Sequence, residues 1–224
     1  TANRNSLQLF DMLHSMRQFD DLTYVHSVNV ALIASILGQW LKFSEKDIRI
    51  LTISGLLHDI GKIMIPNEIL TKPGKLTVAE YNIMKQHVNF GYEKVKNQNI
   101  DIRIKEACLL HHEKCDGTGY PFGLKSDQIP AVAKIIAIAD VYDAMTSARV
   151  YRGALCPFEV IDTMYKDAFT KFEPEYILPF LKNVASSYIN NDVRLSDGRI
   201  GKVVLINENA LSLPIVQCED EFID

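Results

Sequence analysis

The chain has 224 residues, 47% of them hydrophobic and 23% charged, an ordinary globular balance with enough material for one sizeable core. Its formal net charge of −4 excludes a general attraction to nucleic acid or to an anionic membrane, so an anionic substrate must be attracted locally. The four cysteines form no CxxC pair, which excludes a disulfide framework and favours a reducing cytoplasm.

No apolar run approaches the roughly 18 residues that a membrane span requires, and no basic-then-apolar leader opens the chain. We therefore expect a cytoplasmic protein without membrane contact. The sequence starts at Thr1 without a methionine. From this we expect a fragment of a longer protein, with an N-terminal regulatory region missing.

Helical periodicity dominates up to about residue 187. Apolar residues recur at three- and four-residue steps over 7–13, 28–36 and 48–56, which predicts amphipathic or buried helices. Helix-start signals occur at four places, namely Ser44, Thr77 with Glu80, Pro130 and Pro157. We predict six to eight helices in one all-helical domain over residues 1–187.

The period of the apolar residues changes to two after Asn190. Segment 193–207 alternates around an Asp197-Gly198 turn, and segment 211–218 follows a polar turn at 207–209. This pattern predicts a small antiparallel β unit over 188–224 that packs on the helical domain. The predicted fold class is therefore mainly α, a multi-helix domain with a small C-terminal β unit.

Five of the six histidines fall on apolar helix faces or at helix ends. These are His26, His58, His87, His111 and His112. Taken singly, each is best explained as a core histidine that is hydrogen-bonded to a carbonyl, because buried polar groups are usually satisfied in this way. Taken together, several helices send an imidazole inward while the exposed faces carry almost none, and a shared ligand explains this most simply.

Two carboxylates accompany the histidines. Asp59 follows His58 directly, and Asp140 ends a hydrophobic helical run. Adjacent residues on a helix lie about 100° apart, so His58 and Asp59 need a helix end, which Gly61 offers, to face one ion each. Seven imidazole and carboxylate ligands suit two metal ions rather than one, and two-metal sites favour phosphoester hydrolysis by a metal-bridged hydroxide.

These residues form motifs that resemble a known family. His26, HDIGK at 58–62, His87, HHEKCDGTGYP at 111–121 and IIAIADVYDAMTSARVYR at 135–152 are similar to the signature of the HD-GYP family of HD-domain phosphohydrolases, which degrade the bacterial messenger cyclic di-GMP. The resemblance covers roughly residues 20–185. It implies an HD-type phosphohydrolase fold.

The resemblance also implies roles for individual residues. The implied metal ligands are His26, His58, Asp59, His87, His111, His112 and Asp140, with Asp59 in the bridging place. Asp59 and Lys62 form the implied catalytic pair, in which Lys62 reaches a substrate phosphate. The implied substrate contacts are Lys62, Gly119, Tyr120, Pro121, Arg149 and Arg152.

One position departs from part of the family. Some members carry a glutamate four residues before the first histidine and hold a third metal, whereas this chain has Leu22 there. We therefore predict two divalent ions, although Asp20 and Asp21 lie close by in the sequence. Histidine and carboxylate ligands accept iron or manganese, which we favour, and also zinc or nickel.

Four polar residues near the motifs have two interpretations each. Glu113 either orients a metal-bound imidazole or caps the loop, and Asp143 either orients a ligand or hydrogen-bonds Arg152. For Asp116 we favour an Asx-type turn over a metal contact, and for Cys115 a half-buried loop position.

The predicted function is a metal-dependent phosphodiesterase that hydrolyses cyclic di-GMP to linear pGpG, with GMP as a further product left open. One alternative is an HD-type phosphohydrolase of another nucleotide, and another is a non-catalytic signalling module that binds a cyclic dinucleotide or a protein. The predicted partner is a cyclic dinucleotide rather than nucleic acid. A homodimer and signalling-protein partners are left open.

Overall fold

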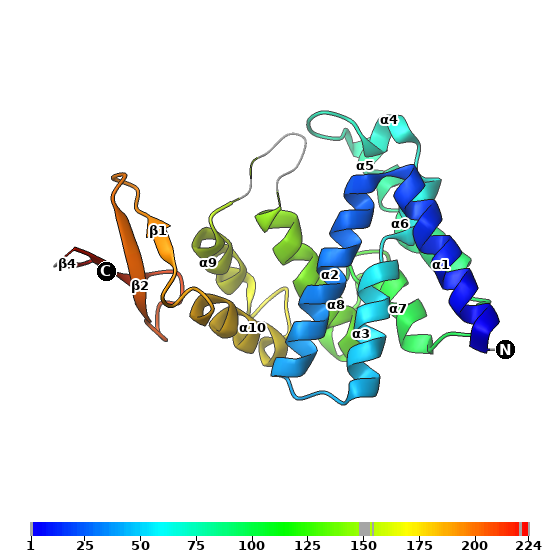
Figure 1. The fold of residues 1–224 in the computed structure, drawn as a ribbon. Helices are drawn as coiled ribbons and strands as arrows, with labels where there is room; N and C mark the ends of the chain where they lie inside the picture. Colours follow the sequence, from blue (N-terminus) through cyan, green and yellow to red (C-terminus); the bar gives the residue numbers. More distant parts are fainter. Residues whose placement is uncertain (1, 148–152, 154, 220, 224) are drawn as a thin grey trace.

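A computed structural model describes residues 2–147, 153, 155–219 and 221–223. Its helical elements are α1 (Ala2–Phe19), α2 (Asp21–Trp40), α3 (Glu45–Leu57), η1 (Ile60–Met64), α4 (Asn67–Leu70), α5 (Val78–Met84), α6 (His87–Val95), α7 (Ile102–Leu110), η2 (Ser126–Gln128), α8 (Ala131–Thr146), α9 (Pro157–Asp167) and α10 (Pro174–Ser186) (Figure 1). The mainly helical fold class is confirmed. The expected six to eight helices were too few for the part of the chain described, because α4 and α5 are too short to show a period in the sequence.

The helix-start signals lie where the sequence places them, with one small correction. The Ser44 hydroxyl accepts a hydrogen bond from the Asp47 amide at the start of α3, and Thr77 with Glu80 forms a capping box at the start of α5. Pro157 is the first residue of α9, whereas Pro130 lies one residue before α8, at its N-cap.

The helical core forms around α2 and α8. Helix α2 contacts α3 closely, since a Cβ on Gly55 would lie 2.5 Å from the Ala31 Cα atom. Val30 and Leu37 of α2 are fully buried in the same hydrophobic cluster as Ile135 and other residues of α8. This contact brings His26 of α2 beside Asp140 of α8.

Helix α2 also corrects an expectation. It is long and apolar enough to pass a length-and-composition test for a membrane span, which we did not expect from the sequence. Of the tested window, 44% is buried inside the protein, and core helices of water-soluble proteins pass the same test, so a single helix of this kind is weak evidence for a span.

Segment η1 lies directly on the start of α6. A Cβ on Gly61 would stand 1.9 Å from the His87 carbonyl oxygen and 2.4 Å from the Gly91 amide nitrogen. Only glycine allows the two backbones to approach so closely. The contact places Asp59, just before η1, beside His87, the first residue of α6.

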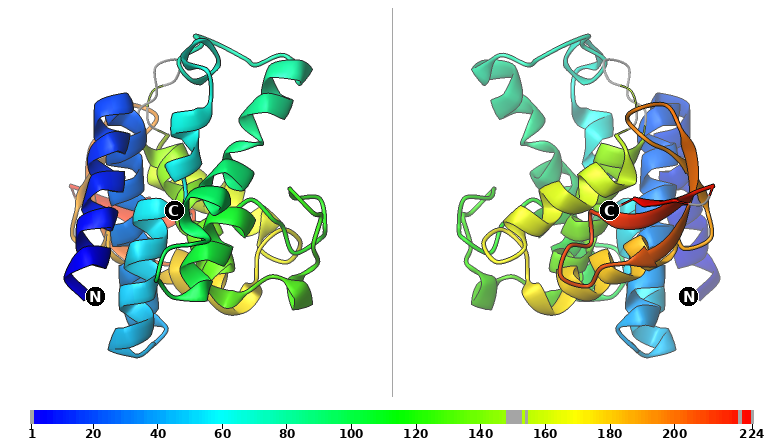
Figure 2. Two further views of the ribbon diagram at one scale, coloured as in Figure 1. Left: turned by 90° about the vertical axis from the view of Figure 1, so that its right-hand side faces the viewer. Right: turned by 90° about the vertical axis from the view of Figure 1, so that its left-hand side faces the viewer.

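The C-terminal strands are β1 (Asp192–Arg194), β2 (Ile200–Ile206), β3 (Pro214–Cys218) and β4 (Glu221–Ile223), paired antiparallel in this order. Gly198 has a φ of +91°, which suits the predicted turn. The sheet lies beyond α9 and α10, at the end of the molecule away from α1 (Figures 1 and 2). Val203 and Val216 join the same buried cluster as Phe180 of α10. The division into two domains at residue 187 stays a prediction.

Candidate metal centre

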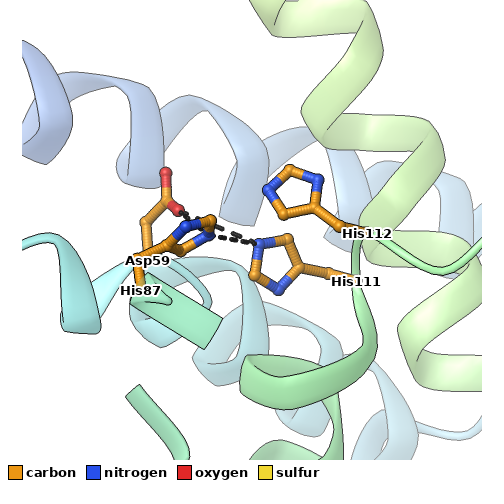
Figure 3. Close-up of side chains that lie close together, drawn as sticks. All are labelled: Asp59, His87, His111 and His112. Atoms are coloured by element: carbon orange, nitrogen blue, oxygen red, sulfur yellow. Dashed lines mark hydrogen bonds and ion pairs between the residues drawn. The ribbon is translucent and has the colours of Figure 1, made fainter. Parts of the chain in front are cut away.

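The seven histidines and aspartates singled out in the sequence come together in two groups. One group consists of His26, His58 and Asp140, and the other consists of Asp59, His87, His111 and His112. Within each group the ligand atoms lie within 4.8 Å of one another. Figure 3 shows the second group, in which the four side chains from three separate segments point toward one another.

Helix ends direct neighbouring residues into different groups. Helix α3 ends at Leu57, His58 forms its C-cap, and Asp59 precedes the 3-10 segment η1. The chain direction changes there, so His58 joins the first group while Asp59 joins the second. His111 forms the C-cap of α7, but here the neighbouring residues stay together, since His111 and His112 both join the second group with their ring centroids 4.2 Å apart.

Asp59 lies between the two groups. Its Oδ2 atom lies 3.3 Å from His58 Nε2 and 3.7 Å from His26 Nε2. Its Oδ1 atom lies 3.3 Å from His87 Nε2 and 3.8 Å from His111 Nε2. One carboxylate thus offers a separate oxygen to each group, which is the arrangement a bridging ligand requires.

Backbone carbonyls fix the orientation of three imidazoles. The Nδ1 atoms donate hydrogen bonds, from His58 to Gly55 O at 2.7 Å, from His87 to Met84 O at 2.8 Å and from His111 to Ala107 O at 2.9 Å. A carbonyl oxygen only accepts, so Nδ1 carries the proton and Nε2 presents a lone pair to the centre. Metal-bound histidines are commonly held in this way.

Two buried polar atoms of the centre make no hydrogen bond within the described residues: His58 Nε2 and Asp59 Oδ1. In addition, the Nε2 atoms of His87 and His111 face each other at 3.4 Å with a lone pair each. Unsatisfied buried acceptors and facing lone pairs are unfavourable unless a cation lies between them. The donor set therefore fits divalent cations.

The protonation states agree with this fit. Burial lowers the pKa of His111 well below its usual value and that of His112 to about 3, so both are neutral at pH 7. Burial opposes ionisation of Asp59, but the Lys62 ammonium group and the neighbouring His58 imidazole outweigh it and hold the pKa of that carboxyl well below its usual value. Neutral imidazoles and ionised carboxylates are the forms that bind metals.

His26 differs from the other histidines of the centre. Its Nδ1 lies 2.6 Å from Asp143 Oδ2, and its Nε2 lies 3.0 Å from Asp140 Oδ1. Burial lowers the pKa of His26, but hydrogen bonds to these two carboxylates outweigh burial and raise the pKa to about 9. A cation that binds at Nε2 must therefore displace a proton.

A cavity of about 570 Å³ opens onto the centre. Side chains from α2, η1, α5, α6 and the 111–121 loop line it, among them His26, His87 and His112. Lys62 also lines the cavity, and its Nζ atom forms an ion pair with Asp59 Oδ2 at 2.5 Å. The cavity is large enough for a small-molecule ligand.

The 111–121 loop forms part of the cavity wall. A Cβ on Gly119 would lie 2.5 Å from the Glu113 Cα atom, so the loop needs glycine there. Tyr120 stacks on His112 with the ring centroids 4.7 Å apart, and it lines the cavity together with Gly119. Pro121, which follows Tyr120 through a cis peptide bond, is half-buried.

The structure decides between the alternatives at three of the four polar residues. The Glu113 carboxylate accepts hydrogen bonds from the amides of Phe122 and Leu124, so it braces the loop. Asp116 accepts from the Thr118 amide, as an Asx turn does, and Cys115 is half-buried.

Asp143 orients His26 through the hydrogen bond to its Nδ1 atom. A second residue, Asn29, holds Asp143, and sequence reasoning missed it. Asn29 Nδ2 donates to Asp143 Oδ1 at 2.9 Å. The only signal in the sequence is that Asn29 lies one helical turn after His26.

Leu22, where part of the family has a metal ligand, is 58% exposed at the cavity, and nearby Asp20 caps α2. Arg149 and Arg152 lie outside the described residues.

Comparisons with known proteins identify the class of this fold and centre. Residues 8–176 match the family model of the HD domain. The chain is 37% identical over 203 residues, 90% of its length, to the cyclic di-GMP phosphodiesterase PA4108 of Pseudomonas aeruginosa. It is 36% identical over 158 residues, 69% of its length, to the 3′3′-cGAMP-specific phosphodiesterase 2 of Vibrio cholerae.

A solved structure shares the fold. The HD domain of the Listeria monocytogenes phosphodiesterase PgpH, in complex with cyclic-di-AMP, aligns with a TM-score of 0.60 at 18% identity, covering 79% of this chain and 95% of that one. This chain spans 49% and 30% of the length of the two curated relatives. The chain belongs to the HD domain family, in its HD-GYP branch.

Proposed function

We propose that this chain is a metal-dependent phosphodiesterase that hydrolyses cyclic di-GMP to linear pGpG. The observation that carries the proposal is the position of Asp59, with one carboxylate oxygen facing each group of ligands. A relative named as a cyclic di-GMP phosphodiesterase, similar over 90% of this chain, supports the substrate. Because cyclic di-GMP is an intracellular messenger, we infer a cytoplasmic location.

Two divalent cations would occupy the centre. His26, His58 and Asp140 would hold one ion, His87, His111 and His112 the other, and Asp59 both. When bound, such ions supply Lewis acidity, which makes water nucleophilic near neutral pH and neutralises charge on phosphate oxygens. Leu22 offers no ligand atom and Asp20 already caps α2, which favours two ions over three. Iron or manganese suits this ligand set, with zinc or nickel as alternatives.

The remaining roles belong to side chains around the cavity. Lys62 would bind the non-bridging oxygens of the reacting phosphate, because its ammonium group lies beside Asp59 and lines the cavity. Gly119 and Tyr120, which line the cavity, would form one wall of the substrate site together with the adjoining Pro121. Arg149 and Arg152 would contact the second phosphate or a guanine, since a guanidinium forks onto phosphate and stacks on rings.

The first test measures metal content and turnover together. Anaerobically prepared protein should contain about two divalent ions per chain and should hydrolyse cyclic di-GMP, while a chelator should abolish turnover. Methyl p-nitrophenyl phosphate, a diester without nucleobases, reports on the centre alone. Protein that binds two ions but cleaves neither substrate would be a binding module, contrary to the proposal.

A second substrate class has its own support. The Vibrio cholerae relative is named as specific for 3′3′-cGAMP. Measuring kcat/KM for cyclic di-GMP, 3′3′-cGAMP and cyclic di-AMP in one panel separates the two proposals. A kcat/KM for 3′3′-cGAMP above that for cyclic di-GMP would replace the substrate and leave the reaction class as proposed.

Asp143 should act as a positioning residue. Its carboxylate holds His26 Nδ1 at 2.6 Å, and loss of such an outer contact typically weakens metal binding roughly 10- to 100-fold. We expect Asp143→Ala to lower metal affinity and turnover by about that factor, as measured by metal titration. Asp162→Ala removes a half-buried carboxylate paired only with Lys166 in the described structure, and it should change neither quantity. Equal metal affinity in both variants would refute the role of Asp143.

A further inference from the structure

One aromatic residue of the cavity has no role in the chemistry described so far. Tyr81 lies on α5, outside the recognised motifs, and its side chain lines the cavity although it is 48% exposed. Met84, three residues later on the same helix face, also lines the cavity, and its carbonyl accepts the Nδ1 proton of His87. Tyr81 is therefore about one helical turn from a residue that touches the metal centre.

The backbone that carries Tyr81 is held in place. The preceding residue, Glu80, accepts hydrogen bonds from the Thr77 amide at 2.7 Å and from Lys72 Nζ at 2.7 and 2.8 Å. These contacts fix the first turn of α5 and tie it to the segment after α4, so an exposed ring on this short helix keeps a defined position. A preorganised aromatic ring binds a planar ligand at a smaller entropic cost than a mobile one.

The two faces of the Tyr81 ring differ. The Lys85 ammonium group lies over the ring, 5.2 Å from its centroid. A cation over one face occupies that face and leaves the other for a planar group. Tyr81 lines the same cavity as Tyr120 of the 111–121 loop. The exposed part of the ring thus faces the same space as the wall formed by the 111–121 loop.

We propose that Tyr81 is a specificity-determining residue that stacks on one nucleobase of the bound cyclic dinucleotide. The inference rests on the proposed function, since it requires a ligand with a base and a phosphate at the metal centre. Stacking on an aromatic ring is tolerant of base identity, so Tyr81 selects for nucleobase-bearing diesters and not for guanine over adenine.

The test compares four proteins with metal content measured in each: wild type, Tyr81→Ala, Tyr81→Phe and Tyr165→Ala. Tyr165 is the matched control, since it is 45% exposed on α9 and does not line the cavity. We expect Tyr81→Ala to raise KM for cyclic di-GMP and Kd for pGpG about tenfold, within the range measured for lost base stacking. Tyr81→Phe keeps the ring and should match wild type, as should Tyr165→Ala.

The outcomes separate this inference from the proposed function. For Tyr81→Ala, the ratio of kcat/KM on cyclic di-GMP to that on methyl p-nitrophenyl phosphate should fall about tenfold. Values of KM and Kd within twofold of wild type would overturn the role of Tyr81 alone, as would an equal loss in Tyr81→Phe. If the wild type cleaves the simple diester but no cyclic dinucleotide, the proposed function fails, and pGpG binding still decides whether Tyr81 stacks.

Discussion

Replacing Asp59 by alanine should reduce cyclic di-GMP hydrolysis by more than about a hundredfold, because loss of a mere outer partner of a metal ligand already costs roughly 10- to 100-fold. Asp59 is itself a proposed metal ligand, so its loss should cost more activity than the loss of an outer partner. Its two oxygens face His58 and His26 on one side and His87 and His111 on the other. Alanine removes both contacts at once, so metal content should fall together with the rate.

Asp59→Asn separates charge from shape. The pKa of Asp59 lies well below its usual value, so the carboxylate is ionised at any pH near neutrality, and asparagine removes that charge while keeping the size. We expect the asparagine variant to lose turnover nearly as completely as the alanine variant, measured at a defined metal concentration. Both should fold, as circular dichroism would show, because the hydrophobic cluster does not include Asp59. Near-normal activity of Asp59→Ala would show that the two-ion assignment is wrong.

The meeting of the seven side chains was largely predictable from the sequence. Imidazoles on several apolar helix faces indicate a common interior point, and the adjacent pair His58 and Asp59 requires a helix end to separate. The structure places that end after Leu57. The prediction works because helix faces and helix ends are determined by nearby residues. Helix faces show as a periodic pattern of apolar residues, and helix ends are marked by glycine.

Contacts between distant segments left no such signal. Nothing in the sequence pairs Asn29 with Asp143, since each is an ordinary polar residue on its own helix. The cavity wall that carries Tyr81 also went unnoticed, because α5 has only seven residues and shows no usable period. The strand over Glu221–Ile223 was missed for the same reason.

Gly61 was predicted from its neighbours in the sequence, but its contact with a distant segment was not. In the sequence it is interpreted as a helix end, and a 3-10 segment does replace the helix there. Its tighter constraint comes from α6, about 26 residues later in the chain, because a Cβ would stand 1.9 Å from the His87 carbonyl oxygen. Sequence reasoning on one segment has no access to that backbone.

Gly61→Ala should therefore destabilise both the fold and the centre. The added methyl group meets backbone atoms of His87 and Gly91, which cannot rotate away as a flexible side chain would. Overpacking in a close contact typically costs about 1–3 kcal/mol, and here η1 must move away from α6. That movement separates Asp59 from His87, whose side chains now lie 3.3 Å apart, so metal affinity should fall with the free energy of unfolding.

Gly91→Ala is the matched control on the other side of the same contact. A Cβ on Gly91 would lie 3.4 Å from the Gly61 amide nitrogen and 3.6 Å from an Ile60 methyl carbon, which are ordinary contact distances. Because Gly91 is inside α6, alanine should leave stability unchanged or raise it by up to about 1 kcal/mol through helix propensity. Chemical denaturation and metal titration of both variants measure the difference. If Gly61→Ala were as stable and bound metal as tightly as Gly91→Ala, the close approach of η1 to α6 would not be what positions Asp59.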